Sequence, residues 1–243
     1  MRKTLLAIAT IIMVGFNFFV EYFTLNGYTR FEIIEAIPIY FLPSTFVYNI
    51  WYVIYVGLIV FAIYLLLSKK DIEADLTKWI YVTYISNFVW IFTWHYGLTG
   101  LAVLAVLIQL ISLVQVYIRL WRYNKPIFAY GIFRVYFAWI VVATISNIAA
   151  VNYLARGGEY IFSAEWTAVA LMAIITFLAL GALKKHMDCL FATVITWAIF
   201  GILVKHFYTS EIIVNSAILL ILLLIVGLAV NALNSNLSKP SKS

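Results

Sequence analysis

Long apolar stretches alternate with short polar segments along the whole chain. Each stretch has roughly 20 residues, the length that a helix needs to cross the hydrocarbon core of a bilayer. Polar residues, glycine and proline mark the breaks between the stretches. The pattern predicts about eight transmembrane helices, at about residues 4–23, 46–67, 77–95, 99–120, 128–152, 164–183, 188–206 and 212–232. We therefore expect an all-α fold, a polytopic membrane helix bundle.

The connections between these helices differ in length. The longest, at about residues 24–44, contains the turn and breaker residues Asn26-Gly27, Pro38 and Pro43. The last two connections are very short, so the sixth, seventh and eighth helices should be antiparallel neighbours. Residues 234–243 are rich in Asn, Ser and Lys, and we expect a polar, disordered tail there.

Composition excludes a soluble globular domain. Hydrophobic residues make up 65% of the chain and charged residues 11%, whereas a soluble domain has roughly 25% charged residues. In a bilayer the apolar side chains can face outward, so the shortage of polar surface is no obstacle to folding. The single cysteine, Cys189, rules out a disulfide within the chain.

Basic residues are concentrated on one side of the predicted bundle. With eight spans, both termini lie on the same side of the membrane. An excess of Lys and Arg marks the cytoplasmic face, so we expect both termini in the cytoplasm, in a membrane of the bacterial cytoplasmic type. Basic loops also account for the net charge of +6, so nucleic acid is not expected as a partner. The 12 residues of this side are Arg2, Lys3, Lys69, Lys70, Lys78, Arg119, Arg122, Lys125, Lys184, Lys185, Lys239 and Lys242, and the 3 of the other are Arg30, Arg156 and Lys205.

Aromatic side chains and a few amides recur inside three of the predicted helices. Within each helix their spacing places them on or near one face. Because an aromatic pocket with a few polar groups suits a flat apolar ligand, we predict a ligand-binding pocket in the outer half of the membrane. Helix packing, with the Asn side chains bonding between helices, is the alternative. The residues are Trp51 and Tyr55 in the second helix, Asn87, Trp90 and Trp94 in the third, and Tyr136, Trp139 and Asn147 in the fifth.

Few other residues are candidates for chemistry. Arg134 lies within the fifth predicted helix, where its side chain can reach the cytoplasmic interface or bind a ligand carboxylate or lipid headgroup. His95 and His206 fall at predicted helix ends, a typical interfacial position, and we expect no metal site. The sequence contains no nucleophile elbow, phosphate-binding loop or carboxylate pair, so we assign no catalytic residue.

Three short motifs follow one another on the second, third and fifth helices. They are Pro43 with Trp51 and Tyr55, then Ser86-Asn87-Phe88-Val89-Trp90 with Phe92 and Trp94, then Tyr136-Phe137-Ala138-Trp139 with Ala143 and Asn147. In type, order and placement they resemble the motifs of the tryptophan-rich sensory protein / translocator protein family. The resemblance covers about residues 1–153, the five-helix unit of that family, so the last three helices lie outside it.

The resemblance implies both an organisation and a function. It implies a five-helix ligand-binding unit at residues 1–155, followed by three additional transmembrane helices at 156–233 and the tail at 234–243. It also implies a membrane receptor or sensor for a hydrophobic ligand of the porphyrin or sterol class, with porphyrin or haem as a ligand rather than a firmly assigned cofactor. A transporter of a small hydrophobic or amphipathic molecule and a porphyrin-modifying membrane enzyme remain alternatives. The lipid bilayer is the partner that the sequence itself implies, and a homodimer is left open.

Overall fold

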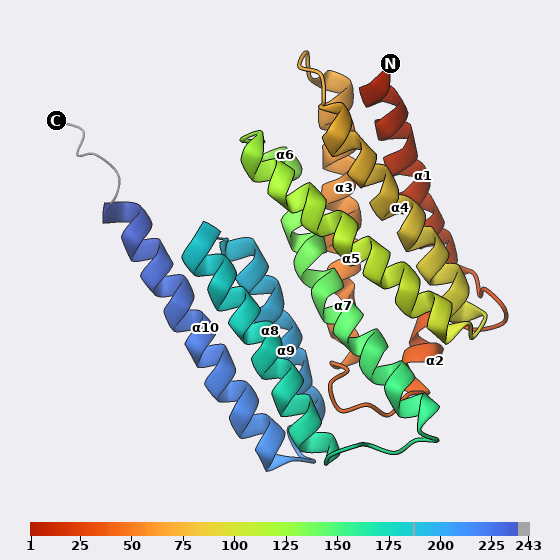
Figure 1. Ribbon diagram of the computed structural model, residues 1–243, viewed down its shortest axis with the longest axis vertical. Coiled ribbons are helices and arrows are strands. Elements are labelled where there is room, and N and C mark those ends of the chain that lie inside the picture. Colours follow the sequence, from red (N-terminus) through yellow and green to blue (C-terminus); the bar gives the residue numbers. More distant parts are fainter. Residues whose placement is uncertain (187, 238–243) are drawn as a thin grey trace. The chain divides into compact units, whose positions relative to one another are not determined.

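The computed structural model describes residues 1–186 and 188–237, which fold into helices joined by loops (Figure 1). Within these residues eight helices have 18 residues or more, and there is no β-strand. The all-α fold is therefore confirmed. The long helices are α1 (Arg2–Tyr22), α3 (Ile50–Leu67), α4 (Ala74–His95), α5 (Thr99–Arg122), α7 (Ile132–Ala155), α8 (Ala164–His186), α9 (Cys189–His206) and α10 (Glu211–Leu237), and the short ones are α2 (Arg30–Glu35), the 3₁₀ helix η1 (Thr45–Asn49) and α6 (Ile127–Tyr130).

Seven helical segments of the described residues are long and apolar enough to cross a membrane, if η1 is counted with α3 and α6 with α7. The remaining long helix, α4, has 22 residues and is about 33 Å long, which suffices to cross the hydrocarbon core. It is less hydrophobic because it buries polar side chains against its neighbours, such as Thr83 against Ser112 of α5 and Asn87 against Asn17 of α1. The polytopic bundle is confirmed, and we take α4 as its eighth span.

The chain forms two compact units. The first comprises Met1–Pro38 and Tyr48–Gly158, and the second comprises Ile39–Val47 and Glu159–Ser243. The sequence predicts a boundary at about residue 155, close to the one observed. It does not predict that part of the long first loop belongs with the last three helices.

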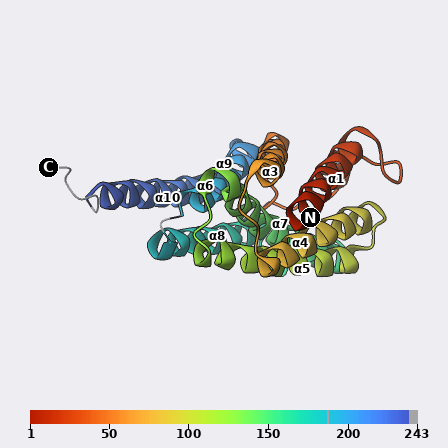
Figure 2. The same ribbon diagram turned by 90° about the horizontal axis from the view of Figure 1, so that it is seen from above.

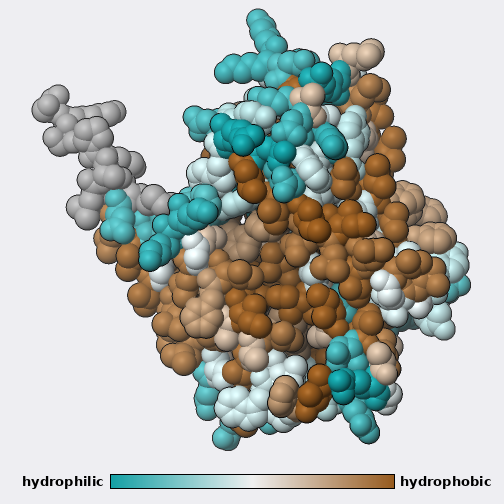
Figure 3. All heavy atoms as spheres, in the orientation of Figure 1, coloured by the Kyte–Doolittle hydropathy of each residue, from teal (hydrophilic) through white to brown (hydrophobic). Residues whose placement is uncertain are grey.

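In the first unit the long helices pack along one another. α4 lies along α5, α5 along α7, and α1 along both α3 and α4, as the views from the side and from above show (Figures 1 and 2). The surface over the middle of these helices is hydrophobic, and hydrophilic residues gather at the end where the α3–α4 and α5–α6 connections lie (Figure 3). Such a surface is typical of helices whose middles contact lipid.

In the second unit α9 runs antiparallel to both α8 and α10, as the short connections predict, and α8 and α10 also pack against each other (Figure 1). The loop segment Ile39–Val47 is bound to α9 by hydrogen bonds. The Ser44 N–H donates to the Gly201 carbonyl oxygen at 3.1 Å, and Trp197 Nε1 donates to the Val47 carbonyl oxygen at 3.1 Å. His206 Nε2 lies 3.0 Å from the Tyr40 carbonyl oxygen. These backbone contacts are why the segment belongs to this unit.

Some helix ends differ from the predicted ones. Local hydrogen bonds determine where a helix begins and ends, and the hydropathy pattern does not show them. The first loop contains α2, which begins with a capping box between Thr29 and Glu32. The Thr29 N–H and hydroxyl both donate to the Glu32 carboxylate and lower the pKa of Glu32. The fifth predicted helix is interrupted at Gly131 and forms α6 and α7.

The C-terminal helix also ends later than predicted. α10 continues to Leu237, four residues into the segment predicted to be a disordered tail. The backbone of its last turn can still bond to carbonyls of the apolar run, so the helix outlasts the hydrophobic pattern by about one turn. The rest of the predicted tail, from residue 238, lies outside the described residues.

The close approach of α3 and α7 gives a test of the packing. A Cβ atom added at Gly57 would lie 2.3 Å from Cγ1 and 2.8 Å from Cβ of Ile132. We predict that Gly57→Ala separates the two helices and lowers stability by about 1–3 kcal/mol, measured as a lower unfolding temperature in detergent. Gly15→Ala in α1 is the matched control, because no described residue lies within 4 Å of its added Cβ. Equal unfolding temperatures for the two variants would contradict the close approach.

Candidate ligand-binding site

Trp51 is central to a group of aromatic rings in the first unit. Its indole stacks on that of Trp90, with centroids 6.2 Å apart and planes at 25°, and contacts Tyr55 at 5.8 Å. Two rings of α7 meet it edge-on, Tyr136 at 5.8 Å and Trp139 at 6.4 Å. All five side chains are buried. We call these five residues the aromatic cluster; it joins α3, α4 and α7.

Helical spacing explains how the cluster forms. Trp51 and Tyr55 are four residues apart on α3, and Tyr136 and Trp139 are three apart on α7. Residues at these spacings lie on one face of a helix. Because α3 packs against α7, the two aromatic faces meet, and Trp90 of α4 completes the group.

Buried amides connect the helices around the aromatic cluster. Asn17 of α1 donates through Nδ2 to Asn87 Oδ1 of α4 at 2.9 Å, and its Oδ1 accepts from the Tyr55 hydroxyl of α3 at 3.1 Å. Trp90 Nε1 donates to Asn147 Oδ1 of α7 at 3.0 Å. These bonds join side chains of different helices in an environment where water cannot substitute for a missing partner.

A fourth amide belongs to the same network. Gln109 of α5 donates through Nε2 to the Tyr136 hydroxyl at 2.6 Å. With this bond all five long helices of the first unit contribute a side chain to the aromatic cluster or to the amides around it.

Three buried polar atoms of this region have no hydrogen-bond partner among the described residues. They are the donors Asn87 Nδ2 and Trp139 Nε1 and the acceptor Gln109 Oε1. A buried polar group without a partner costs about 1–3 kcal/mol. The cluster therefore combines a large aromatic surface with hydrogen-bonding capacity that the chain itself leaves unused.

Seven of the eight residues predicted to bind a ligand come together here. The five rings of the cluster form direct contacts. Asn147 bonds to Trp90, and Asn87 is linked to Tyr55 through Asn17. Trp94 is half-buried near the end of α4, and among the described residues no ring contact or hydrogen bond joins its side chain to the cluster. Trp94 follows Trp90 by four residues, but this spacing alone does not show that both side chains meet the same neighbours. Successive turns of α4 face different partners.

Three members of the site are not among the predicted residues. Asn17 and Gln109 bond to the cluster, and Tyr48 meets Trp139 edge-on at 5.6 Å. A signal for two of them exists in the sequence, because an amide in the middle of an apolar span is rare unless it faces the bundle interior. Tyr48 gives no such signal, because tyrosine is common near helix ends in membranes.

The two histidines of interest lie in different units. His95 Nδ1 is 2.8 Å from the Ile91 carbonyl oxygen of its own helix, and His206 contacts Tyr40 and Thr209 in the second unit. Within the described residues no group of three or more His, Cys, Asp or Glu side chains could hold a metal ion.

Comparison with known protein families bears on the whole chain. A family model described as TSPO-like protein matches residues 3–230. The chain belongs to the TSPO-like protein family. Membership makes it a membrane protein of the sensor or translocator kind. No curated protein and no solved structure matches the chain.

The extent of the match corrects one expectation. The motifs suggest that the resemblance ends near residue 153, but the match continues through α8, α9 and most of α10. The last three helices are therefore part of what makes this chain a TSPO-like protein. The recognisable motifs all end by Asn147, so they give no indication of α8–α10.

The bond between Trp90 and Asn147 can be measured in this TSPO-like protein. We predict that Trp90→Phe and Asn147→Ala show a coupling energy of about 0.6–1.7 kcal/mol in a double-mutant cycle, the range found for hydrogen bonds between membrane helices. The measurement is unfolding by denaturant in mixed micelles. Trp90→Phe combined with Thr144→Val is the control cycle, because the Thr144 hydroxyl donates to Ile140 of its own helix. Coupling no larger than in the control would exclude the bond.

Proposed function

We propose that this TSPO-like protein is a membrane receptor or sensor that binds a flat hydrophobic ligand, of the porphyrin or sterol class, at the aromatic cluster. The observation that carries the proposal is the pair of unpaired donors, Asn87 Nδ2 and Trp139 Nε1, within an aromatic environment. Ring faces supply contact area for a flat apolar molecule. The two N–H groups would bind acceptor oxygens at its edge, such as a carboxylate, carbonyl or hydroxyl.

A ligand must separate some rings of the aromatic cluster as it enters, because these rings contact one another and are buried. Contacts between rings are then replaced by contacts between rings and ligand, and the net gain comes from the donors that acquire partners. We therefore expect selectivity to depend on the polar edge of the ligand as much as on its size.

The proposal includes an orientation, with both termini in the cytoplasm. Contacts at one end of the first unit support it. Arg2 donates to the Ile72 carbonyl oxygen at 3.0 Å, and Lys3 donates to that of Ser68. The N-terminus, the α3–α4 connection with Lys69 and Lys70, and their basic charge are thus at the same end, which the positive-inside rule assigns to the cytoplasm.

The cluster is nearer the opposite end. Trp51 is the second residue of α3, whose far end leads to Lys69, and Trp90 is five residues from the end of α4. In the proposed orientation Trp51 and Trp90 are in the outer half of the membrane, and Tyr136 and Trp139, the fifth and eighth residues of α7, lie deeper.

Replacement of single indoles tests the binding site. We predict that Trp51→Leu, Trp90→Leu and Trp139→Leu each weaken the binding of protoporphyrin IX about three- to tenfold, because each removes one flat face but keeps an apolar side chain. Trp94→Leu, one turn along α4, is the matched control and should stay within about twofold of the wild type. Affinity is measured by calorimetry or fluorescence quenching. Equal affinity in all four variants and the wild type would rule out the cluster as the site.

Cysteine labelling tests the orientation. In a Cys189→Ser background, we predict that a cysteine at Ser68 reacts with a membrane-impermeant maleimide only after the cells are opened. A cysteine at Thr29 should react in intact cells, because it precedes α2 in the external loop. The reverse pattern would show that the basic end of the first unit faces outward.

A further inference from the structure

A cavity of about 1060 Å³ opens at the basic end of the first unit, away from the aromatic cluster. Four basic and two acidic side chains face it together with aromatic and aliphatic ones. Its walls come from the ends of α3, α5, α6 and α7 and from the loops between them. The lining includes Lys69, Lys70, Glu73, Trp121, Lys125 and Arg134, and Tyr64 and Tyr130 form part of its apolar side.

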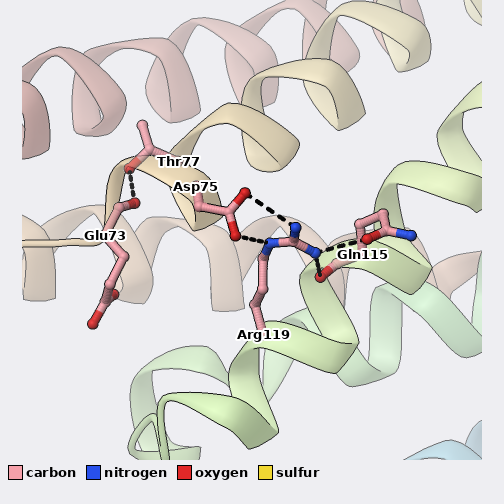
Figure 4. Close-up of polar contacts among 5 residues, drawn as sticks. All are labelled: Glu73, Asp75, Thr77, Gln115 and Arg119. Atoms are coloured by element: carbon pink, nitrogen blue, oxygen red, sulfur yellow. Dashed lines mark hydrogen bonds and ion pairs between the residues drawn. The ribbon is translucent and has the colours of Figure 1, made fainter.

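Two cations near this end, Arg119 and Lys125, already have an anionic partner. Arg119 binds the Asp75 carboxylate through two bonds, Nε to Oδ2 at 2.6 Å and the second nitrogen to Oδ1 at 3.0 Å, and also donates to Gln115 (Figure 4). Lys125 Nζ lies 2.6 Å from Glu73 Oε2. The carboxylates of Glu73 and Asp75 therefore neutralise Lys125 and Arg119.

Arg134 differs from these cations. The residue is only 8% exposed, and its guanidinium group lies over the Trp121 ring at 4.1 Å from the centroid. Nε has no hydrogen-bond partner, and no carboxylate contacts the guanidinium group among the described residues. A buried charge is costly unless it is paired. Because Arg134 lines the cavity, an anion bound there would supply the missing partner.

We propose that this cavity binds the phosphate group of an organic phosphate, either a lipid or a soluble compound. The planar guanidinium fork of Arg134 suits two oxygens of a phosphate, and the ammonium groups of Lys69 and Lys70 can approach the others from the exposed side. The cavity is much larger than one phosphate group, and Tyr64 and Tyr130 offer an apolar wall for what is attached to it. The site does not depend on the proposed function of the aromatic cluster.

The phosphate can come from a lipid or from a soluble compound, and three probes separate these sources. Native mass spectrometry of the full chain in detergent would measure binding of phosphatidylglycerol, of diacylglycerol with the same acyl chains, and of glycerol 3-phosphate. We expect the wild type to bind at least one of the two phosphate compounds more tightly than diacylglycerol. Arg134→Gln should weaken that binding by about tenfold or more.

Two further variants make the result specific. Arg134→Lys keeps the buried cation and loses the fork, so its affinity should fall between those of the wild type and Arg134→Gln; it also serves if Arg134→Gln fails to fold. Arg122→Gln removes an exposed charge from the end of α5 that does not line the cavity, and its affinity should stay within about twofold of the wild type.

Each outcome either identifies the source of the phosphate or overturns the proposal. Arg134-dependent binding of phosphatidylglycerol alone supports a lipid, and Arg134-dependent binding of glycerol 3-phosphate supports a soluble phosphate. Binding that is unchanged in the Arg134 variants or that falls equally in Arg122→Gln would overturn the proposal. So would wild-type binding of both phosphate compounds that is no tighter than the binding of diacylglycerol.

Discussion

An amide side chain in the hydrocarbon core of a bilayer must find its partners within the protein, because lipid offers none. In the first unit this constraint is met at Asn17, whose two polar atoms bond to Asn87 of α4 and Tyr55 of α3. Asn147 Oδ1 accepts from Trp90, and Gln109 Nε2 donates to Tyr136, although Gln109 Oε1 has no partner among the described residues. Each bond fixes the rotation of one helix relative to another, and together they determine which faces of α3, α4 and α7 meet.

The aromatic cluster follows from that arrangement. Once the amides set the helix rotations, Trp51 contacts rings from α4 and α7 at the same time. The same constraint also explains the proposed binding chemistry. The network satisfies most of its polar atoms but leaves Asn87 Nδ2 and Trp139 Nε1 without a partner, which is why a ligand with an acceptor edge would stabilise the site. At the basic end of this unit, Arg134 is a buried cation that contacts no carboxylate among the described residues.

Much of this architecture can be predicted from the sequence because it depends on local pattern. Hydropathy locates all eight long helices, and spacing of three or four residues identifies the rings of the cluster. Other features depend on contacts between distant segments and have no local signal. The binding of Ile39–Val47 to α9 rests on backbone hydrogen bonds such as that of Ser44 to Gly201, which any residue could form. Trp94 fits the helical stripe as well as Trp90 does, and only the packing of α4 against its neighbours separates them.

Binding of a ligand at the indoles of the cluster can be observed directly by nuclear magnetic resonance of the full chain. The chain has 8 Trp residues, and labelling with ¹⁵N-tryptophan would give one indole N–H signal for each. During titration with protoporphyrin IX, we expect saturable shifts of the Trp51, Trp90 and Trp139 signals, largest for Trp139 because its unpaired N–H gains a partner. Saturable binding that shifts only the signals of tryptophans outside the cluster, such as Trp166 or Trp197, would contradict the account.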